Sequence, residues 1–206
     1  MVAYFGLALA AMGWGVVAGR PDLYHHPEPW LALPFPRGTL LSAALGLGVA
    51  LVVVGSTRVL VRRARWAQQL HREFRELLGP LGGGAIAVLA LSSGIAEEVF
   101  FRGAMQASLG WVASSLIFGA VHVGPGKRFL PWTLWATVMG FVFGLIHALT
   151  GELVGPIVAH VLINYENLHF IDSYDPSPPR GGGPRPKRPA DPSLVSSRLR
   201  AGGRTR

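Results

Sequence analysis

Ser92-Ser-Gly-Ile-Ala-Glu-Glu-Val-Phe-Phe-Arg102 places two adjacent acids and one arginine inside a stretch that is otherwise apolar. The acids are Glu97 and Glu98, five and four residues before Arg102. The surrounding segment, Leu81–Leu109, has the length and composition of a helix buried in a membrane. An ionised side chain near the centre of a bilayer costs at least about 2.5–3.5 kcal/mol, so three of them this close together indicate a functional site.

The composition of the chain is that of a membrane protein. It has 206 residues, of which 50% are hydrophobic and only 15% charged, against roughly 25% charged in an average soluble protein. There is no cysteine, which excludes a disulfide framework, a thiolate zinc site and a cysteine nucleophile. The net charge of +8 comes mainly from residues 58–75 and from the tail after residue 171. Basic blocks beside apolar segments mark the cytoplasmic flanks of membrane helices, so we expect membrane lipids as partners and no nucleic acid.

Six apolar segments predict an all-α fold: a polytopic integral membrane bundle of about six membrane segments. A further helix, Arg62–Leu78, is predicted to lie at the membrane surface, because Trp66, Leu70, Phe74 and Leu77/Leu78 recur at helical spacing among charged residues. If all six segments cross the membrane, the basic blocks and both termini lie on the cytoplasmic side. The segments are Met1–Gly19, Gly38–Val61, Leu81–Leu109, Trp111–Val123, Pro131–Thr150 and Val154–Phe170.

This pattern divides the chain into three regions. Residues 1–80 are expected to form a two-helix membrane region that ends in the amphipathic linker helix. Residues 81–171 form the membrane core that carries the polar residues. Residues 172–206 are rich in Pro, Gly and Arg. They are expected to be a disordered basic tail, because such a composition buries too little apolar surface to order itself.

The two acids are expected to have different surroundings. On a helix, Glu98 and Arg102 are i,i+4 neighbours, a spacing that favours an ion pair. Glu97 points about 100° away from Glu98, so it is left free to act as a general base. A structural ion pair between helices, or a binding site for lipid head groups, explains the same three residues equally well.

Three more polar residues follow in apolar sequence. His122 ends the run Phe118-Gly-Ala-Val-His122; taken alone, it is more typical of a polar contact between helices or of an interfacial histidine than of a functional residue. His160 and Asn164 are one turn apart on one helical face, where two donors suit a developing oxyanion. His and Asn also commonly form hydrogen bonds between membrane helices. Gly155-Pro156, just before them, is expected to bend the helix and open a polar cavity.

The ordered combination of these residues resembles the CPBP family of intramembrane proteases, also called CAAX proteases, bacteriocin-processing enzymes or Abi proteins. The three motifs lie on successive apolar segments between about Leu81 and Leu168. The resemblance implies an all-helical membrane bundle with its active site in a water-accessible cavity. The motifs in this chain are Glu97-Glu98-Val-Phe-Phe-Arg102, Phe118-Gly-Ala-Val-His122 and His160-Val-Leu-Ile-Asn164.

The resemblance also implies a role for each motif residue. Phe118 is expected to pack beside the site. The polar residues act in pairs: Glu97 with His122 holds and activates the attacking water, Glu98 with Arg102 orients these groups, and His160 with Asn164 stabilises the oxyanion.

Metal dependence is the open question at such a site, because members of this family are often described as metalloproteases. No HExxH helix occurs in the chain. We therefore expect a metal-free site without a cofactor. The alternative is a zinc ion held by Glu97 or Glu98 together with His122 and His160.

The predicted function is that of an intramembrane endopeptidase, which cuts a membrane-associated protein or peptide near its membrane-embedded C-terminal end. One alternative is a non-catalytic scaffold or immunity protein that keeps the polar cluster for stability. Another is a transporter or proton relay, which the lack of a matching pair of broken helices disfavours. The Ala/Gly/Arg/Pro-rich composition suggests a GC-rich bacterium, so we expect a multi-pass protein of the inner membrane.

Overall fold

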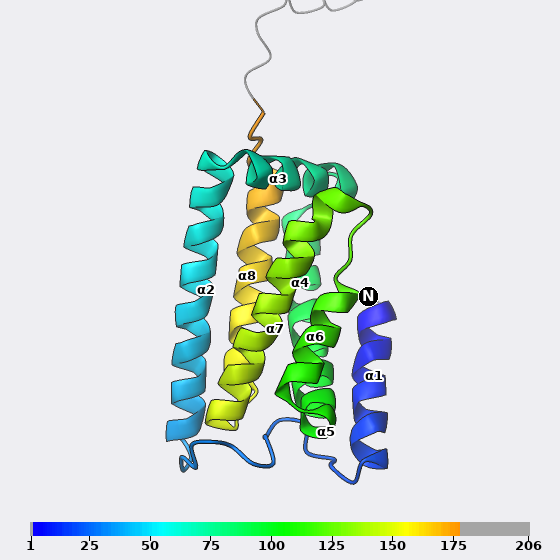
Figure 1. Ribbon diagram of the computed structural model, residues 1–206, viewed down its shortest axis with the longest axis vertical. Coiled ribbons are helices and arrows are strands. Elements are labelled where there is room, and N and C mark those ends of the chain that lie inside the picture. Colours follow the sequence, from blue (N-terminus) through cyan, green and yellow to red (C-terminus); the bar gives the residue numbers. More distant parts are fainter. Residues whose placement is uncertain (1, 178–206) are drawn as a thin grey trace, which may run out of the picture. The chain divides into compact units, whose positions relative to one another are not determined.

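The computed structural model describes residues 2–177; the regular elements among these residues are helices, and no strand occurs among them. In Figure 1, α2, α4, α7 and α8 run side by side and α3 lies across one end. Met1–Pro176 forms one compact unit. The predicted all-α bundle is confirmed, while most of the expected disordered tail lies outside the described residues. In chain order the helices are α1 (Val2–Val17), α2 (Arg37–Arg63), α3 (Arg65–Leu78), α4 (Gly83–Glu98), η1 (Val99–Gln106), α5 (Ala107–Leu109), α6 (Trp111–Val121), η2 (Lys127–Phe129), α7 (Leu130–Thr150) and α8 (Val154–Ser173).

Three helical segments are long and apolar enough to cross a membrane: Arg37–Arg63, Gly83–Leu109 and Lys127–Thr150. By contrast, α1 and α6 have only 16 and 11 residues. At about 1.5 Å per residue, both fall short of the roughly 30 Å hydrocarbon core. All six predicted apolar segments are therefore helices, but three of them meet the requirement for a full crossing, and the number of crossings stays a prediction.

Close packing of α2 against α8 fixes the position of α8, the helix that carries His160 and Asn164. Ser42, Gly46 and Ala50 recur every four residues along α2 and are buried. A side chain at Gly46 would overlap the backbone of Gly155. Small residues allow such close approach of helices in membranes. Ser42 adds two hydrogen bonds, from its Oγ to the Glu152 carbonyl at 3.0 Å and from the Gly155 amide to Oγ at 3.1 Å.

The Gly155-Pro156 pair does not bend α8 as the sequence predicted. Pro156 lies within the first turn of the helix, which begins at Val154. Proline is tolerated there because the amides of the first turn have no partner within the helix. On the opposite side of α8, Gly94 of α4 packs directly on Val161: a Cβ at Gly94 would lie 2.9 Å from the Val161 nitrogen. This contact brings the acidic end of α4 against α8.

The predicted amphipathic helix is confirmed as α3, and it packs against the bundle through small and polar residues. The buried residues are Ala67 and His71, whereas Trp66 and Leu77 are exposed. The His71 ring lies against Phe170 of α8, and its Nε2 is 2.9 Å from the Tyr174 carbonyl oxygen. Burial lowers the pKa of His71, so the ring is neutral near pH 7 and can donate this hydrogen bond. The exposed apolar residues suit a helix that lies at a membrane surface.

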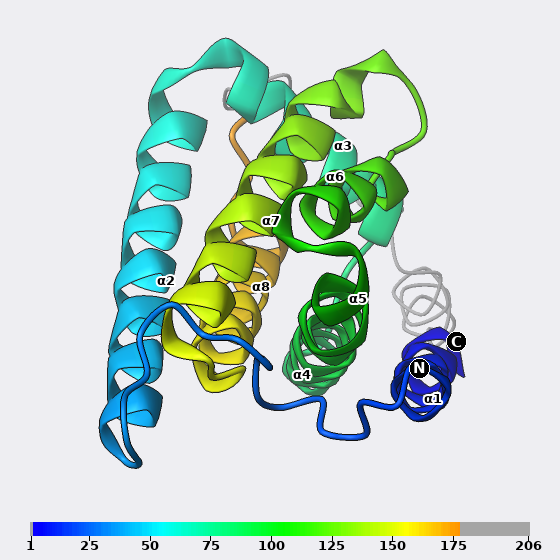
Figure 2. The same ribbon diagram turned by 60° about the horizontal axis from the view of Figure 1, so that its bottom comes forward.

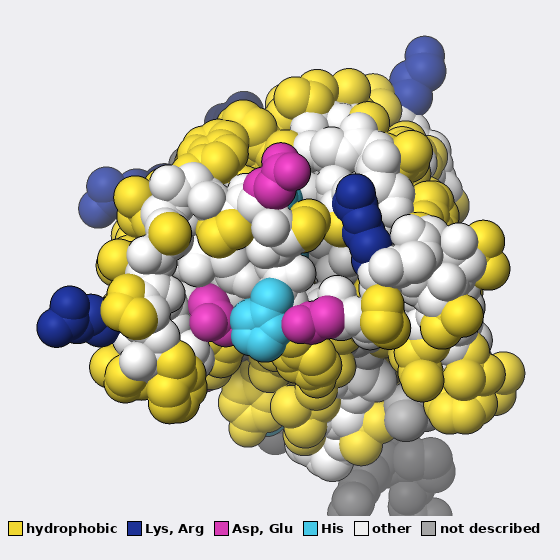
Figure 3. All heavy atoms as spheres, turned by 90° about the horizontal axis from the view of Figure 1, so that it is seen from below, with side chains coloured by type: hydrophobic (Ala, Val, Ile, Leu, Met, Phe, Trp, Pro, Cys, Tyr) yellow, Lys and Arg dark blue, Asp and Glu magenta, His cyan; other side chains and the backbone are white. Residues whose placement is uncertain are grey.

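At the opposite end of the bundle, the segment between α1 and α2 crosses the ends of the other helices (Figure 2). Its backbone is anchored to the end of α7: the amides of His26 and Trp30 donate to the carbonyls of Gly151 and Ala148, both at 2.8 Å. The His25 ring bonds to Asp22 at 2.8 Å and lies 3.7 Å from Glu152. Figure 3 shows a histidine between two acidic side chains on this face. The hydrogen bond with Asp22 raises the pKa of His25.

Candidate active site

The two acids are the last residues of α4, and the chain continues directly into the π-helical segment η1. The sequence spacing predicted an uninterrupted α-helix here. A π-helix adds a residue to each turn and is often found at functional sites. Together α4, η1 and α5 form one 27-residue helical segment, and Glu97 and Glu98 lie near its midpoint. The site is therefore about halfway along a helix that is long enough to span a membrane.

Glu98 is buried in an ion pair, as the spacing predicted. Its Oε1 is 3.0 Å from Arg102 Nη1 and 2.7 Å from His160 Nδ1. The side chains of Glu98 and Arg102 are 0% and 1% exposed. Arg102 also donates from Nη2 to the Gly140 carbonyl at 3.2 Å. Three helical segments, α4–η1, α7 and α8, are thus joined through one guanidinium and one carboxylate.

Glu97 faces two imidazole rings and no arginine. Its Oε2 lies 3.4 Å from His122 Nε2 and 3.9 Å from His160 Nε2. Among the residues that the structure describes, this oxygen has no hydrogen-bond partner although it is buried. The sequence predicted that Glu97 would be left free while Glu98 is paired, and the geometry agrees. A buried carboxylate oxygen beside two ring nitrogens is suited to hold a polar reactant.

The partners of the two histidines determine which ring nitrogens carry hydrogen. His122 Nδ1 is 2.7 Å from the Phe118 carbonyl oxygen. A carbonyl only accepts, so Nδ1 donates, and Nε2 of the neutral ring faces Glu97 as an acceptor. His160 Nδ1 likewise donates to Glu98. Nε2 of His160 can therefore donate only when the ring is protonated.

Asn164 lies one turn beyond His160 and contacts α4. Its Nδ2 donates to Ser93 Oγ at 3.0 Å, and Ser93 Oγ donates in turn to the Leu89 carbonyl at 2.7 Å. An amide nitrogen has two hydrogens, so one donor of Asn164 remains for a ligand. No described contact joins Asn164 to Glu97 or to His160. The structure therefore brings Glu97, Glu98, Arg102, His122 and His160 into direct contact and places Asn164 at the edge of this group.

Phe118 packs beside the site, as expected. Its ring is 4.3 Å from the Arg102 guanidinium and its centroid 4.3 Å from that of His122. Phe118 is only 2% exposed. A cation over an aromatic face is stabilised electrostatically, and more so when both are desolvated. The ring thereby fixes the positions of the arginine and the histidine on either side of it.

Two residues near the site were not identified from the sequence. Ser93 is buried one turn before Glu97 and anchors Asn164. The second is Tyr4 of α1, the helix that packs against α4, which carries Ser93 and Glu97. Serine and tyrosine are ordinary in apolar helices, so only their position in the fold links them to the site. For Ser93 the four-residue step to Glu97 is a signal that could have been used.

The predicted zinc alternative was compared with this geometry. In the described part of the chain, no group of three or more His, Asp or Glu side chains is arranged to hold a metal ion. The candidate ligands Glu97, His122 and His160 do not form such a group. A site that works without a cofactor stays a prediction from the sequence.

The fold and the site together define a helical membrane protein with a buried Glu-Glu-Arg cluster facing His and Asn. Residues 82–165 match the family described as type II CAAX prenyl endopeptidase Rce1-like. The resemblance inferred from the motifs is thereby confirmed. Over 79 residues the chain is 39% identical to the uncharacterized protein YpbD of Bacillus subtilis strain 168. The match covers 38% of this chain and 41% of that protein. No solved structure is significantly similar.

Proposed function

We propose that the protein is an intramembrane endopeptidase that hydrolyses a peptide bond with water activated by Glu97. The observation that carries the proposal is that the two adjacent acids differ in their hydrogen-bond partners. Glu98 Oε1 is shared by Arg102 and His160, whereas the buried Glu97 Oε2 has no hydrogen-bond partner among the described residues and faces two rings. The match of residues 82–165 to the Rce1-like endopeptidase family supports the same chemistry.

In the proposed reaction, a water molecule donates hydrogen bonds to Glu97 Oε2 and to Nε2 of His122. Glu97 takes a proton as the water oxygen attacks the scissile carbonyl carbon. The oxyanion that forms accepts hydrogen bonds from Nε2–H of protonated His160 and from Nδ2–H of Asn164. Glu97 then delivers its proton to the leaving nitrogen, and the carbon–nitrogen bond breaks. Glu98 and Arg102 take no proton; they hold His160 in its orientation.

The depth of the site supports a membrane-associated substrate. Glu97 lies near the middle of a membrane-length helix, so a scissile bond must enter the apolar layer to reach it. We propose that the substrate is a bacterial protein or peptide and that it is cut near its membrane-embedded C-terminal end. Cleavage takes place in the inner membrane, whose lipids surround the enzyme. The basic end of the bundle, at α3, is assigned to the cytoplasm by the excess of Lys and Arg there.

Alanine variants of His160 and Asn164 test the oxyanion role. Each variant should lose about 10²–10³-fold in kcat with little change in KM, because an oxyanion donor acts in the transition state. The measurement is steady-state cleavage of a library of internally quenched peptides with apolar C-termini by purified protein. Asn167→Ala is the matched control: Asn167 lies one turn further along α8 and accepts from Arg58, away from the site. A large rise in KM at unchanged kcat would contradict the assignment.

Chelation tests the expectation of a metal-free site. Purified protein should keep its activity after exhaustive treatment with EDTA or phenanthroline. A zinc enzyme would lose activity and regain it on addition of Zn²⁺. Stoichiometric zinc in the wild type that is lost in His160→Ala would overturn the metal-free reading and leave the protease assignment in place.

A further inference from the structure

A row of buried polar side chains leads from the site toward the end of the bundle opposite α3. Glu98, Arg102 and Gln106 follow one another at four-residue intervals and are 0%, 1% and 2% exposed. Arg102 donates to the Gly140 carbonyl at 3.2 Å and Gln106 to the Gly144 carbonyl at 2.9 Å. The two acceptors are also four residues apart on α7. The row is therefore matched step by step by carbonyl groups of α7.

Several polar atoms along this row have no partner. Glu98 Oε2, Gln106 Oε1 and both ring nitrogens of His147 are buried without a hydrogen bond to any described residue. His147, on the turn after Gly144, is only 1% exposed. Buried polar groups that lack protein partners are characteristically satisfied by ordered water. No sequence motif singles out either Gln106 or His147.

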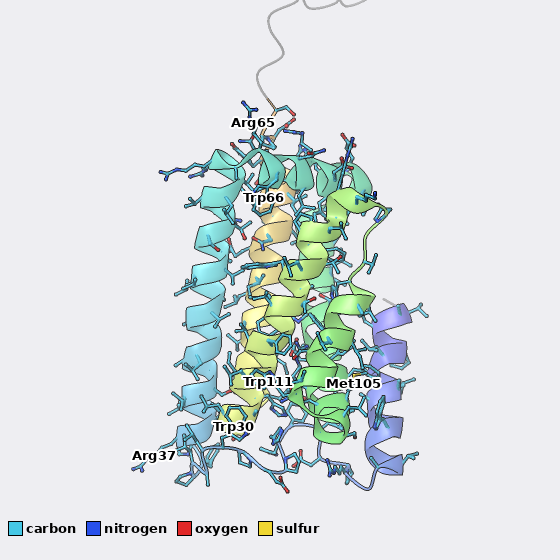
Figure 4. The ribbon with its side chains drawn as sticks, viewed as in Figure 1. Trp30, Arg37, Arg65, Trp66, Met105 and Trp111 are labelled. Carbon is cyan, nitrogen blue, oxygen red and sulfur yellow. The ribbon has the colours of Figure 1, made fainter. Side chains whose placement is uncertain are left out.

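The row ends at a cavity of about 280 Å³. Gln106, Trp111 and Ala148 line its inner side, and Ala148 continues the series Gly140 and Gly144 on α7. His26, which also lines it, lies 5.2 Å from the His147 ring. Trp30 and Trp111 both line the cavity, with their ring centroids 6.0 Å apart. Figure 4 labels both residues in the half of the bundle opposite α3. One water takes up roughly 30 Å³ in the liquid, so the cavity accommodates several.

Gly144 allows Gln106 and Trp111 to pack directly against α7. A Cβ at this position would lie 2.7 Å from Gln106 Oε1 and 2.6 Å from Trp111 Cδ1. The missing side chain at residue 144 thus lets the buried Gln106 oxygen lie next to Trp111, which lines the cavity with it. Outside the cavity, the exposed Arg20 and Glu28 place charged groups at its rim.

We infer that this cavity is a water-binding site and that Gln106 and His147 conduct water from it to Glu97 and Glu98. The inference rests on the proposed function, because each peptide bond hydrolysed consumes one water. Gln106 Oε1 accepts a hydrogen bond from water, and the neutral His147 ring donates one and accepts one. Water would reach the acids along the row between η1 and α7, so it need not pass through the lipid from which the substrate enters.

Cysteine accessibility tests the route without requiring catalysis, since the natural chain has no cysteine. Gln106→Cys and Ala148→Cys are made in the full chain, with Met105→Cys as the control. Met105 is 6% exposed on the same segment but packs in an apolar cluster with Phe101 and Phe118. A small cationic methanethiosulfonate is added to the protein in detergent. Thiolates react only in contact with water, so both cavity variants should react at least about tenfold faster than Met105→Cys. Equal rates for all three would overturn the inference.

A second measurement tests whether the water route past Gln106 is needed for turnover. Gln106→Leu removes the polar atoms at similar size and should lower kcat about tenfold while KM for the peptide and the melting temperature stay near wild type. Wild-type kcat in a folded Gln106→Leu protein would contradict water conduction through this residue. If the protein cleaves no peptide, the proposed function fails, and the labelling rates still decide whether the cavity and Gln106 are hydrated.

Discussion

The charge of Arg102 is shared among more groups than its ion pair alone. Its guanidinium contacts Glu98 at 3.0 Å, the Gly140 carbonyl at 3.2 Å and the Phe118 ring at 4.3 Å. A buried arginine is tolerated when its donors are paired, and its removal leaves the carboxylate unpaired in a medium of low dielectric constant. Glu98 would then lose the partner that fixes its contact with His160.

Arg102→Ala should therefore impair folding as well as activity. Breaking a buried ion pair from one side costs on the order of 3–5 kcal/mol. The measurement is yield and thermal melting in detergent. Arg128→Ala is the control, because Arg128 pairs with Glu73 but is 67% exposed, and surface pairs contribute only about 0–1 kcal/mol. Equal melting temperatures for Arg102→Ala and wild type would show that the buried pair is not needed for stability.

Contacts between residues of one helix could be predicted from the sequence better than contacts between residues of different helices. Glu98 with Arg102 follows from a four-residue step, and the separate orientation of Glu97 follows from the next position. The position of Tyr4 relative to the site depends on how α1 packs against α4, and nothing in the local sequence encodes it. Gln106 and His147 likewise gain their significance only from the cavity beside them.

Among the helices, α8 depends on its close contact with α2 to present His160 and Asn164. The contact rests on the absence of a side chain at Gly46, which lies against the Gly155 backbone. Gly48, two residues further along α2, has nothing within 4 Å of where its Cβ would be. The two glycines occupy the same helix in different surroundings, so they form a matched pair for an experiment.

Gly46→Ala should destabilise the protein by about 1–3 kcal/mol, because the added carbon forces the two backbones apart. Gly48→Ala should be neutral or stabilising by roughly 0.5–1 kcal/mol, since alanine is the better helix former. Thermal melting of both variants in the same detergent checks the difference. Equal effects at the two positions would contradict the close contact between α2 and α8.

The helices themselves were largely predictable, because apolar runs of membrane length leave few alternatives. All six apolar segments and the amphipathic helix are present near their expected bounds. The π-helical turn at Val99–Gln106 and the buried face of α3 were not predicted. Both depend on what the helix packs against: α3 buries Ala67 and His71 against α8, although its largest apolar residues lie elsewhere on the helix.

In the described bundle, the polar site lies between two ends that carry different kinds of residues. The α3 end carries most of the basic residues, and the opposite end carries the loop with His25, Asp22 and the polar cavity. A membrane-embedded hydrolase needs two reactants that favour opposite environments. The arrangement supports a separation of the two, in which an apolar substrate enters between helices and water enters from an end.

The most direct test of the central claim compares newly formed protein termini in membranes that contain wild type, Glu97→Gln or Glu76→Gln protein. Glu97→Gln keeps the shape of the side chain but cannot take a proton from water, and loss of a general base costs about 10²–10⁴-fold. Glu76 is exposed on α3, so Glu76→Gln is the control. Mass spectrometry of termini should find new C-termini, in or next to membrane segments, with wild type and Glu76→Gln and not with Glu97→Gln. Identical sets of termini in all three membranes would contradict the assignment of Glu97 as the base of an intramembrane protease.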